Sequence, residues 1–179
     1  MADEEKAAEK EEKAAEETSV QDKLNEIGRR IHDRFPELEI DESVFNCDIA
    51  LIVPAERLVE IGTELRDMDG IKLDTLSSLT AVDYKDRVQV VYHLFSIETP
   101  ARVVLKVNLP ADDPVVDSVT DVWPTANWHE REAYDLMGVH FRNHPDLRRI
   151  LLPEGFPGHP LRKDWVDLRP KRKRKVRPR

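Results

Sequence analysis

The chain has 179 residues, of which 40% are hydrophobic and 36% charged, and its formal net charge at pH 7 is −8. This length fits one domain, and no apolar run approaches the roughly 18–20 residues that a membrane-spanning helix needs. The single cysteine, Cys47, excludes an internal disulfide and an iron–sulfur centre held by this chain alone. We expect Cys47 to be a buried or partly buried thiol.

The charge is distributed unevenly along the chain. Residues 1–17 carry eight acids and three lysines, residues 162–179 carry ten bases and two acids, and the residues between them carry 15 bases and 26 acids. The alanine-rich N-terminus lacks the basic and apolar regions of a secretory signal, which favours a cytoplasmic protein. It also lacks an apolar stripe, so we expect a disordered acidic tail at 1–17.

Two amphipathic helices are predicted in the first half of the chain. Ser19 is a suitable N-cap for the first helix, whose apolar residues recur at helical spacing as far as Phe35. The apolar run at 49–53 then predicts a short buried strand. Pro54 opens the second helix, which has one apolar side and ends before a glycine at position 70.

Alternation of apolar and polar residues replaces helical spacing after the second helix. Three strands are predicted, at residues 76–83, 87–97 and 103–109. Short turns join them, so we expect an antiparallel meander with the two helices on one face. The result is a small two-layer α+β domain over residues 18–126, with helices packed on a mixed, largely antiparallel sheet. Pro114 is expected to open a further helix through about Val122.

The next stretch carries its own helix signals. Asn127 is a suitable N-cap, and Glu130 follows three residues later, as in a capping box. Gly138 fits the position just after the last helical residue. Residues 128–137 are therefore predicted to be helical.

Charged residues lie within the apolar stripe of this helix. On the helical wheel Glu132 falls between the large apolar side chains of Trp128 and Leu136. Arg131 and Asp135 are four residues apart, so we expect them to pair. Removing one member of a buried pair costs roughly 3–5 kcal/mol, and the pattern therefore favours an ionic cluster of fixed geometry.

Residues 144–161 are predicted to lack regular structure, because prolines recur through them and exclude a helix. The residues just before them, 139–141, suit a brief strand. Several apolar side chains follow, and they would face water if this segment were free. We therefore expect residues 127–165 to form a helix and an extended irregular segment that docks on a partner protein, followed by a basic tail at 166–179.

At these residues the chain resembles a known family. The sequences Glu-Arg-Glu at 130–132 and Gly-His-Pro-Leu-Arg-Lys-Asp at 158–164 are similar to the signature of the C-type, 30 kDa-like subunit of respiratory complex I, the NADH-quinone oxidoreductase. Between them the resemblance includes Tyr134, Asp135, Leu136, Gly138, Phe141, His144, Pro145, Leu147, Arg148, Arg149, Ile150 and Leu151. The last third of the chain matches closely, whereas the region before it agrees only in pattern.

The resemblance implies a structural subunit without a catalytic site or cofactor of its own. In complex I this subunit lies in the peripheral arm on the cytoplasmic side of the membrane. It packs against the quinone-site subunit and the subunit with the terminal iron–sulfur cluster, and flavin and the clusters belong to partner subunits. The residues that it assigns to partner binding are Glu130, Arg131, Glu132, Tyr134, Asp135, His144, Arg148, Arg149, His159, Arg162, Lys163 and Asp164.

Three alternatives stay open. The equivalent subunit of a membrane-bound nickel–iron hydrogenase or an archaeal dehydrogenase would share the docking motif but change the electron donor or the product. A metal-dependent hydrolase would use His140 and His144, yet Gly138 and Pro145 oppose a helix there and no HExxH motif is present. A nucleic-acid-binding module would use the basic tail, which has no interleaved aromatic residues.

Overall fold

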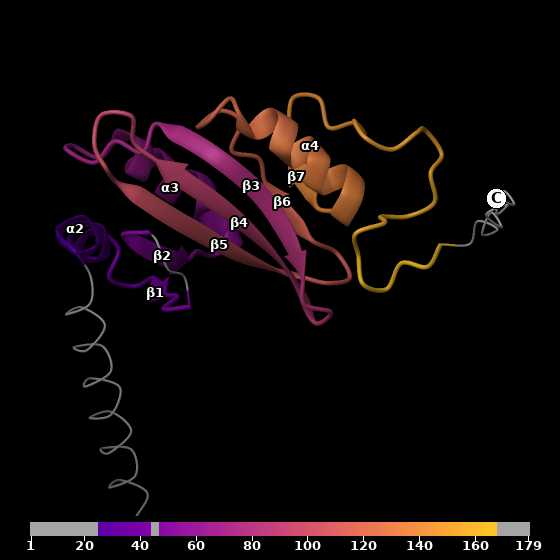
Figure 1. Ribbon diagram of the computed structural model, residues 1–179, viewed down its shortest axis with the longest axis horizontal. Coiled ribbons are helices and arrows are strands. Elements are labelled where there is room, and N and C mark those ends of the chain that lie inside the picture. The colour runs from indigo at the N-terminus through magenta and orange to yellow at the C-terminus, as the bar shows by residue number, and fades with distance from the viewer. Residues whose placement is uncertain (1–24, 44–46, 168–179) are drawn as a thin grey trace, which may run out of the picture.

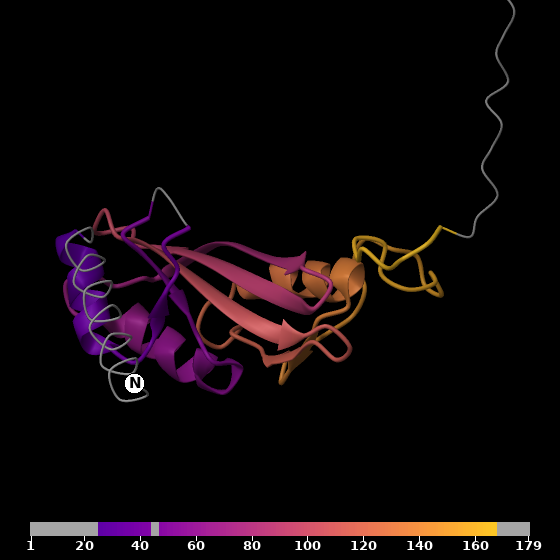
Figure 2. The ribbon, with the colours of Figure 1, turned by 90° about the horizontal axis from the view of Figure 1, so that it is seen from below.

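The computed structural model describes residues 25–43 and 47–167 of the chain. The predicted acidic tail at 1–17, the Ser19 cap and the basic-tail residues after position 167 lie outside these ranges. In the described part, helices pack against one face of a five-stranded sheet (Figures 1 and 2). The predicted α+β class is therefore confirmed.

Most helices and strands follow one another in the order that local patterns led us to expect, but a strand stands where a helix was expected at 114–122. The strands are β1 (Glu39–Ile40), β2 (Ile49–Ile52), β3 (Thr75–Asp83), β4 (Arg87–Phe95), β5 (Arg102–Pro110), β6 (Val115–Asp117) and β7 (His140–Arg142). The helices are α2 (Glu26–Arg34), the short 3₁₀ helix η1 (Ala55–Arg57), α3 (Leu58–Asp67) and α4 (Ala126–Met137).

The five-stranded sheet has the strand order β1-β2-β5-β4-β3. Strands β3, β4 and β5 form the predicted antiparallel meander, while β2 runs parallel to β5 and β1 runs antiparallel to β2. The sheet is mixed and largely antiparallel, as expected. The register places Leu79, Tyr92 and Leu105 in one row across three strands, and all three side chains are buried on the helix-covered face.

The first two helices are positioned by a cap and an apolar stripe. The Asn25 side chain accepts a hydrogen bond from the Gly28 N–H at 2.8 Å, which satisfies a free donor in the first turn of α2. In α3, Leu58, Ile61 and Leu65 follow helical spacing and are fully buried, as predicted. Both helices therefore contribute to one hydrophobic core.

Trp123 joins α3 to the later part of the chain. A Cβ atom added at Gly62 would lie 3.1 Å from the Trp123 ring, so the glycine allows the indole to pack directly on the helix. The indole Nε1 donates to the Leu73 carbonyl oxygen at 2.8 Å, which gives the buried ring a partner for its only donor. The start of α4 is thereby fixed against the core.

The helix predicted from Pro114 to Val122 is wrong. Residues 115–117 form β6, which pairs in parallel with β7 and places Val116 opposite Phe141, both buried. The β-branched residues of this stretch suit a strand once a partner strand is available. That partner lies about 25 residues further along the chain. The brief strand predicted at 139–141 is confirmed as β7.

Residues 143–167, here called the C-terminal segment, contain no helix or strand. They leave β7, run beside α4 and end on the side of the molecule away from α2 (Figure 1). The absence of helix over residues 144–161 agrees with the prediction from the prolines.

Candidate partner-docking site

Helix α4 begins earlier than predicted, at Ala126 rather than at residue 128. The turn before it already supplies acceptors, since the Ala126 N–H donates to the Trp123 carbonyl oxygen at 2.9 Å. Asn127 therefore lies inside the helix, and its predicted role as N-cap is wrong. The predicted C-terminus is confirmed, because Gly138 has a φ of 75° and its N–H donates to the Tyr134 carbonyl oxygen at 3.0 Å.

Glu130 points into the protein and makes no capping box. Its side chain is 0% exposed, and its two carboxyl oxygens accept hydrogen bonds from Ser118 Oγ at 2.6 Å and from the Val119 N–H at 2.8 Å. Burial raises the pKa of this carboxyl to about 7, although both hydrogen bonds act in the opposite direction. Glu130 thus ties the connection between β6 and α4 to the helix.

Glu132 lies on the exposed side of α4, not within an apolar stripe as predicted. The face that covers the sheet consists of Ala126, Glu130, Ala133 and Met137, all buried at spacings of three and four. Trp128, which anchored the predicted stripe, is itself largely exposed. The predicted position of Glu132 is therefore wrong because the helix is rotated about its axis.

Arg131 contacts a ring and a backbone carbonyl. Its guanidinium carbon lies 5.1 Å from the centroid of the Trp128 ring, and its Nε donates to the Arg148 carbonyl oxygen at 3.2 Å. The predicted pair with Asp135 is wrong, since within the described residues the cation close to Asp135 is Arg149, at 3.7 Å. Arg131 instead attaches the C-terminal segment to α4.

Asp135 is the main attachment point of the C-terminal segment. Its buried carboxylate accepts three backbone hydrogen bonds through one oxygen, from the N–H groups of Ile150 at 3.1 Å, Leu151 at 2.8 Å and Leu152 at 2.8 Å. Burial raises the pKa of Asp135, but these three donors and the Arg149 charge outweigh it and hold the pKa below its ordinary value. Asp135 is therefore an ionised acceptor at neutral pH.

The far end of the C-terminal segment is held by four further contacts. His159 Nδ1 lies 2.9 Å from the Asp135 carbonyl oxygen, and the Leu161 N–H donates to the Leu136 carbonyl oxygen at 3.1 Å. Arg162 Nη2 donates to the Ala111 carbonyl oxygen at 2.7 Å, and the Lys163 N–H donates to Asp83 Oδ2 at 2.8 Å. The segment therefore spans from the end of α4 to the turns that follow β3 and β5.

Asp83 is an attachment point of the C-terminal segment that the sequence did not reveal. It is buried, and it also accepts the Lys85 N–H at 2.7 Å. The hydrogen bond from Lys163 and the one from Lys85 hold its pKa below the ordinary value. An aspartate before a turn is common, and nothing in the local pattern links it to a residue 80 positions later. Its role emerges only from the fold.

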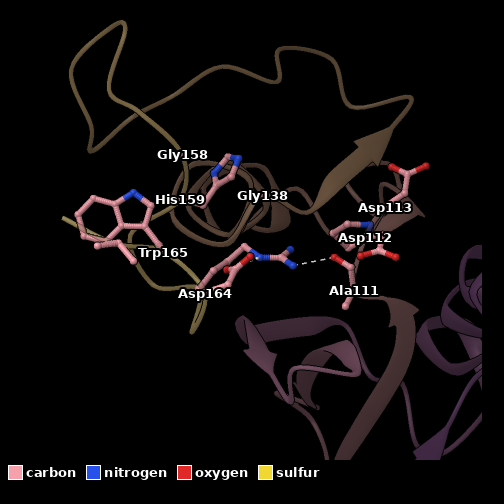
Figure 3. A pocket seen from close by; sticks show the side chains of 11 residues that line it. Ala111, Asp112, Asp113, Gly138, Gly158, His159, Asp164 and Trp165 are labelled. Atoms are coloured by element: carbon pink, nitrogen blue, oxygen red, sulfur yellow. Dashed lines mark hydrogen bonds and ion pairs between the residues drawn. The ribbon is translucent and has the colours of Figure 1, made fainter. Parts of the chain in front are cut away.

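A groove of about 660 Å³ lies between the connection that follows β5 and the end of the C-terminal segment. Figure 3 shows His159 and Trp165 on one side of it and Asp112 and Asp113 on the other. The hydrogen bond from Arg162 Nη2 to the Ala111 carbonyl oxygen joins the two sides. The segment approaches α4 closely here, because a Cβ atom at Gly138 would lie 2.6 Å from the His159 ring.

Several apolar side chains of this region face solvent. Trp128, Leu151, Leu161 and Val166 are each more than half exposed and are here called the contact face. Trp165 is less exposed, since it stacks on Phe156 with ring centroids 5.9 Å apart. A hydrogen-bonded segment without secondary structure thus presents Leu151, Leu161 and Val166 to solvent, and α4 presents Trp128.

The remaining predicted site residues lie around these anchors. Tyr134 is half-buried, with its ring edge-on to His140 at 6.4 Å between centroids. Arg148 is exposed and pairs with Asp146 at 2.9 Å, and Asp164 is exposed near Arg162 at 3.5 Å. The fold therefore brings all twelve predicted residues to α4 and the segment beside it.

Side chains that hold metals do not cluster in the described part of the chain, where no group of three or more His, Cys, Asp or Glu residues is suited to an ion. His140 and His144 have different neighbours, the ring of Tyr134 and the helix α4. Among residues 25–43 and 47–167, no helix has the length and apolar character to cross a membrane.

Comparison with known proteins gives concordant matches. The family model described as "Respiratory-chain NADH dehydrogenase, 30 Kd subunit" matches residues 51–171. The C-type subunit of the NADH-quinone oxidoreductase of Moorella thermoacetica is 52% identical over 134 residues, which cover 73% of this chain and 87% of that protein. The corresponding protein of a Roseiflexus species is 41% identical over 138 residues, which cover 75% and 79%.

Two solved structures share the fold. A trypsin-resistant fragment of Nqo5 is 30% identical with a TM-score of 0.60, and the match covers 68% of this chain and 99% of the fragment. A chain of the membrane-bound sulfane sulfur reductase, an archaeal respiratory membrane complex, is 25% identical with a TM-score of 0.67, and the match covers 80% and 85%.

Proposed function

Because the chain belongs to the 30 kDa subunit family of respiratory-chain NADH dehydrogenases, we propose that it is a structural subunit of a proton-translocating NADH:quinone oxidoreductase. In this proposal it supports electron transfer from NADH to quinone without a catalytic site or cofactor of its own. Flavin and iron–sulfur clusters belong to its partners. It associates with the cytoplasmic side of the membrane through the complex.

The observation that carries the proposal is the attachment of the C-terminal segment. A stretch without helix or strand keeps a defined path because the buried Asp135 carboxylate accepts three of its N–H groups. A segment ordered before binding loses less conformational entropy when a partner docks. The exposed apolar contact face beside it supplies the surface that such a partner would cover.

The predicted partner-binding residues divide into two groups. Six hold the segment or the start of α4 within the chain: Glu130, Arg131, Asp135, His144, His159 and Arg162. The side chains of Glu132, Arg148, Lys163 and Asp164 are exposed, and Tyr134 and Arg149 are half-buried. We assign the first group to positioning, and the others to contact with the quinone-site subunit and the subunit of the terminal iron–sulfur cluster.

A gentle affinity purification of this chain from its own membranes tests the proposal. Mass spectrometry should identify quinone-site, iron–sulfur and flavin subunits in the eluate, together with bound flavin and iron. Recovery of a metal-loaded chain alone would overturn the proposal.

Two variants sharpen this experiment. Leu151→Asp places a charge on the contact face but keeps the backbone N–H that donates a hydrogen bond to Asp135. The variant should therefore lower the recovery of partner subunits by at least about tenfold. Ile97→Asp is the matched control, because Ile97 is 75% exposed in the turn between β4 and β5. Equal recovery from both variants would place the partner on another surface.

A second candidate function is favoured by one comparison. The likeness to a chain of an archaeal sulfane sulfur reductase covers 80% of this chain, so the same fold serves a complex with different chemistry. The purification separates the two, since the NADH:quinone oxidoreductase proposed above requires a flavin subunit in the eluate. A nickel–iron subunit in the eluate would identify the hydrogenase branch.

A further inference from the structure

The groove between the connection that follows β5 and the end of the C-terminal segment carries an excess of negative charge. Its lining holds three carboxylates, those of Asp112, Asp113 and Asp164, but only one guanidinium, that of Arg162. Asp164 lies 3.5 Å from Arg162 Nε, whereas no cation among residues 25–43 and 47–167 forms an ion pair with the exposed Asp112 or Asp113. The groove therefore favours a cationic occupant.

The walls of the groove are fixed by packing within the chain. A Cβ atom at Gly158 would lie 2.8 Å from the Trp165 ring, so this ring lies directly on the backbone, as the His159 ring does at Gly138. Trp165 also donates its Nε1 hydrogen to the Pro157 carbonyl oxygen at 2.8 Å. The groove thus has its shape before an occupant enters, which lowers the entropic cost of binding.

Arg162 shows how the groove holds a cation. Its Nη2 donates to the Ala111 carbonyl oxygen at 2.7 Å on one side, and its Nε faces Asp164 in the C-terminal segment. The planar guanidinium offers several donors at once, which suits a site with acceptors on two sides. One arginine side chain spans the groove, and Asp112 and Asp113 are left for further cations.

The chain itself supplies such cations next to the groove. Val166 lines the groove, and residues 168–179 carry eight bases and no acid. These twelve residues follow the described range, which ends at position 167. An extended residue spans up to roughly 3.3–3.6 Å, so the stretch from Arg169 to Lys173 is long enough to reach a wall that Arg162 reaches with its side chain alone.

We propose that residues 168–179 bind in this groove, with their lysine and arginine side chains on the carboxylates of Asp112 and Asp113. Charge-assisted hydrogen bonds between these groups hold the two parts together. Because the occupant is covalently joined to the groove wall, its effective concentration is on the order of millimolar, well above that of a free basic peptide. The contact joins the end of the C-terminal segment to the connection between β5 and β6.

Carbodiimide cross-linking of the full chain tests this contact, because the reagent joins a carboxylate to an amine without a spacer. Mass spectrometry should find Lys171 or Lys173 joined to Asp112 or Asp113. The yield should fall at least about fivefold as the salt concentration rises from about 0.02 M to about 0.5 M, where screening acts within roughly 4 Å. Equal yields at Asp33, which is exposed on α2, would overturn the proposal.

Mixing nitrogen-15-labelled and unlabelled chains before cross-linking separates two occupants. Cross-links within one chain contain a single isotope, and these are expected. Cross-links that combine both isotopes would show that the groove takes the basic residues of a second copy, which would overturn the proposal.

The indole N–H signal of Trp165 in the nuclear magnetic resonance spectrum provides a second measurement. Replacing Lys171, Arg172, Lys173 and Arg174 with Gln should shift this signal in the wild-type background. The indole signal of Trp123, buried in the core, should stay in place and report that the fold is intact. An unchanged Trp165 signal, together with a shift on adding free hexa-arginine, would assign the groove to a basic segment of another protein and overturn the proposal.

A matched pair of double variants identifies the carboxylates. In Asp112→Asn with Asp113→Asn, the four glutamine substitutions should no longer shift the Trp165 signal. In Asp33→Asn with Asp69→Asn, which removes the same charge from exposed positions on α2 and after α3, the shift should persist. Equal shifts in both backgrounds would overturn the proposal. The chain is studied without partners, so either result is independent of the proposed function.

Discussion

The Asp135 carboxylate accepts a hydrogen bond from the Leu151 N–H at 2.8 Å, across 16 positions of the chain. Two neighbouring N–H groups use the same oxygen, so one helical side chain organises a turn of an otherwise irregular segment. Helix α4 serves as a rigid support on which this segment is mounted. This attachment positions Leu151 of the contact face, while the contacts of residues 159–163 hold the far end of the segment.

Replacing Asp135 with Ala should detach the C-terminal segment while the sheet and its helices stay folded. Each buried donor left without a partner costs about 1–3 kcal/mol, and the three N–H groups can recover partners only by moving into water. We expect rapid trypsin cleavage after Arg148 and Arg149 in the variant and slow cleavage in the wild type, measured by mass spectrometry of the digest.

Glu132→Gln is the matched control for this change, because Glu132 also lies on α4 but is exposed. Its digestion should follow the wild-type time course. If Asp135→Ala were digested no faster than Glu132→Gln, Asp135 would not be the attachment point.

Replacing Glu130 with Gln should change how stability depends on pH. Burial raises the pKa of Glu130 from 4.5 to about 7, so its contribution to the free energy of unfolding is complete below about pH 4.5 and is lost as the pH rises through 7. Glutamine can accept the Val119 N–H and donate to Ser118 Oγ without this loss. As the pH rises from 4.5 to 8, the free energy of unfolding of the variant should therefore increase relative to that of the wild type by up to roughly 3 kcal/mol.

Urea unfolding of wild type and variant at pH 4.5 and at pH 8 measures this difference in stability. A difference between the two proteins that stays constant from pH 4.5 to 8 would show that Glu130 does not titrate in this range. Glu132→Gln again provides the control, since an exposed carboxyl should leave the pH profile unchanged.

Alanine substitutions at two glycines with nearly equal φ angles distinguish the cost of backbone strain from the cost of a packing clash. Gly138 has a φ of 75° and Gly155 a φ of 77°. An alanine costs about 1–2 kcal/mol in either left-handed position. At Gly138 the new Cβ would also lie 2.6 Å from the His159 ring, whereas at Gly155 nothing lies within 4 Å.

Gly138→Ala should therefore lower the free energy of unfolding by more than about 2 kcal/mol, and Gly155→Ala by no more than about 1–2 kcal/mol. Denaturant titration of both variants checks the order. Equal losses would mean that His159 moves away freely and is not packed on the end of α4.

Local patterns predicted the parts of the fold that local interactions determine. The meander follows from alternation along each strand, and Gly138 ends α4 because a helix C-terminus needs a left-handed residue. Strand β6 was mistaken for a helix because its partner β7 lies about 25 residues later. Rules based on neighbouring residues cannot predict the pairing of β6 with β7.

The candidate site divides in the same way. The resemblance pointed to the right stretch of chain, but the spacing rule paired Arg131 with Asp135, whereas Asp135 binds backbone N–H groups 15–17 positions later. Asp83 was missed for the same reason, since its acceptor role depends on Lys163. Buried acceptors for irregular segments are specified by the fold and leave no periodic signal.

Replacing Trp123 with Phe should destabilise the fold without detaching the C-terminal segment. The indole Nε1 donates to the Leu73 carbonyl oxygen at 2.8 Å in the core, and phenylalanine would leave that oxygen without this donor and a small void beside Gly62. Losing a buried hydrogen-bond partner costs about 1–3 kcal/mol, and the void adds to it. Thermal unfolding should show a melting temperature lower by several degrees, because about 1 kcal/mol corresponds to roughly 2–4 °C for a chain of this size. Trypsin should still cleave slowly after Arg149 below that temperature, since Asp135 keeps its three donors. Early cleavage there would mean that the segment depends on the core around Trp123 as well as on α4.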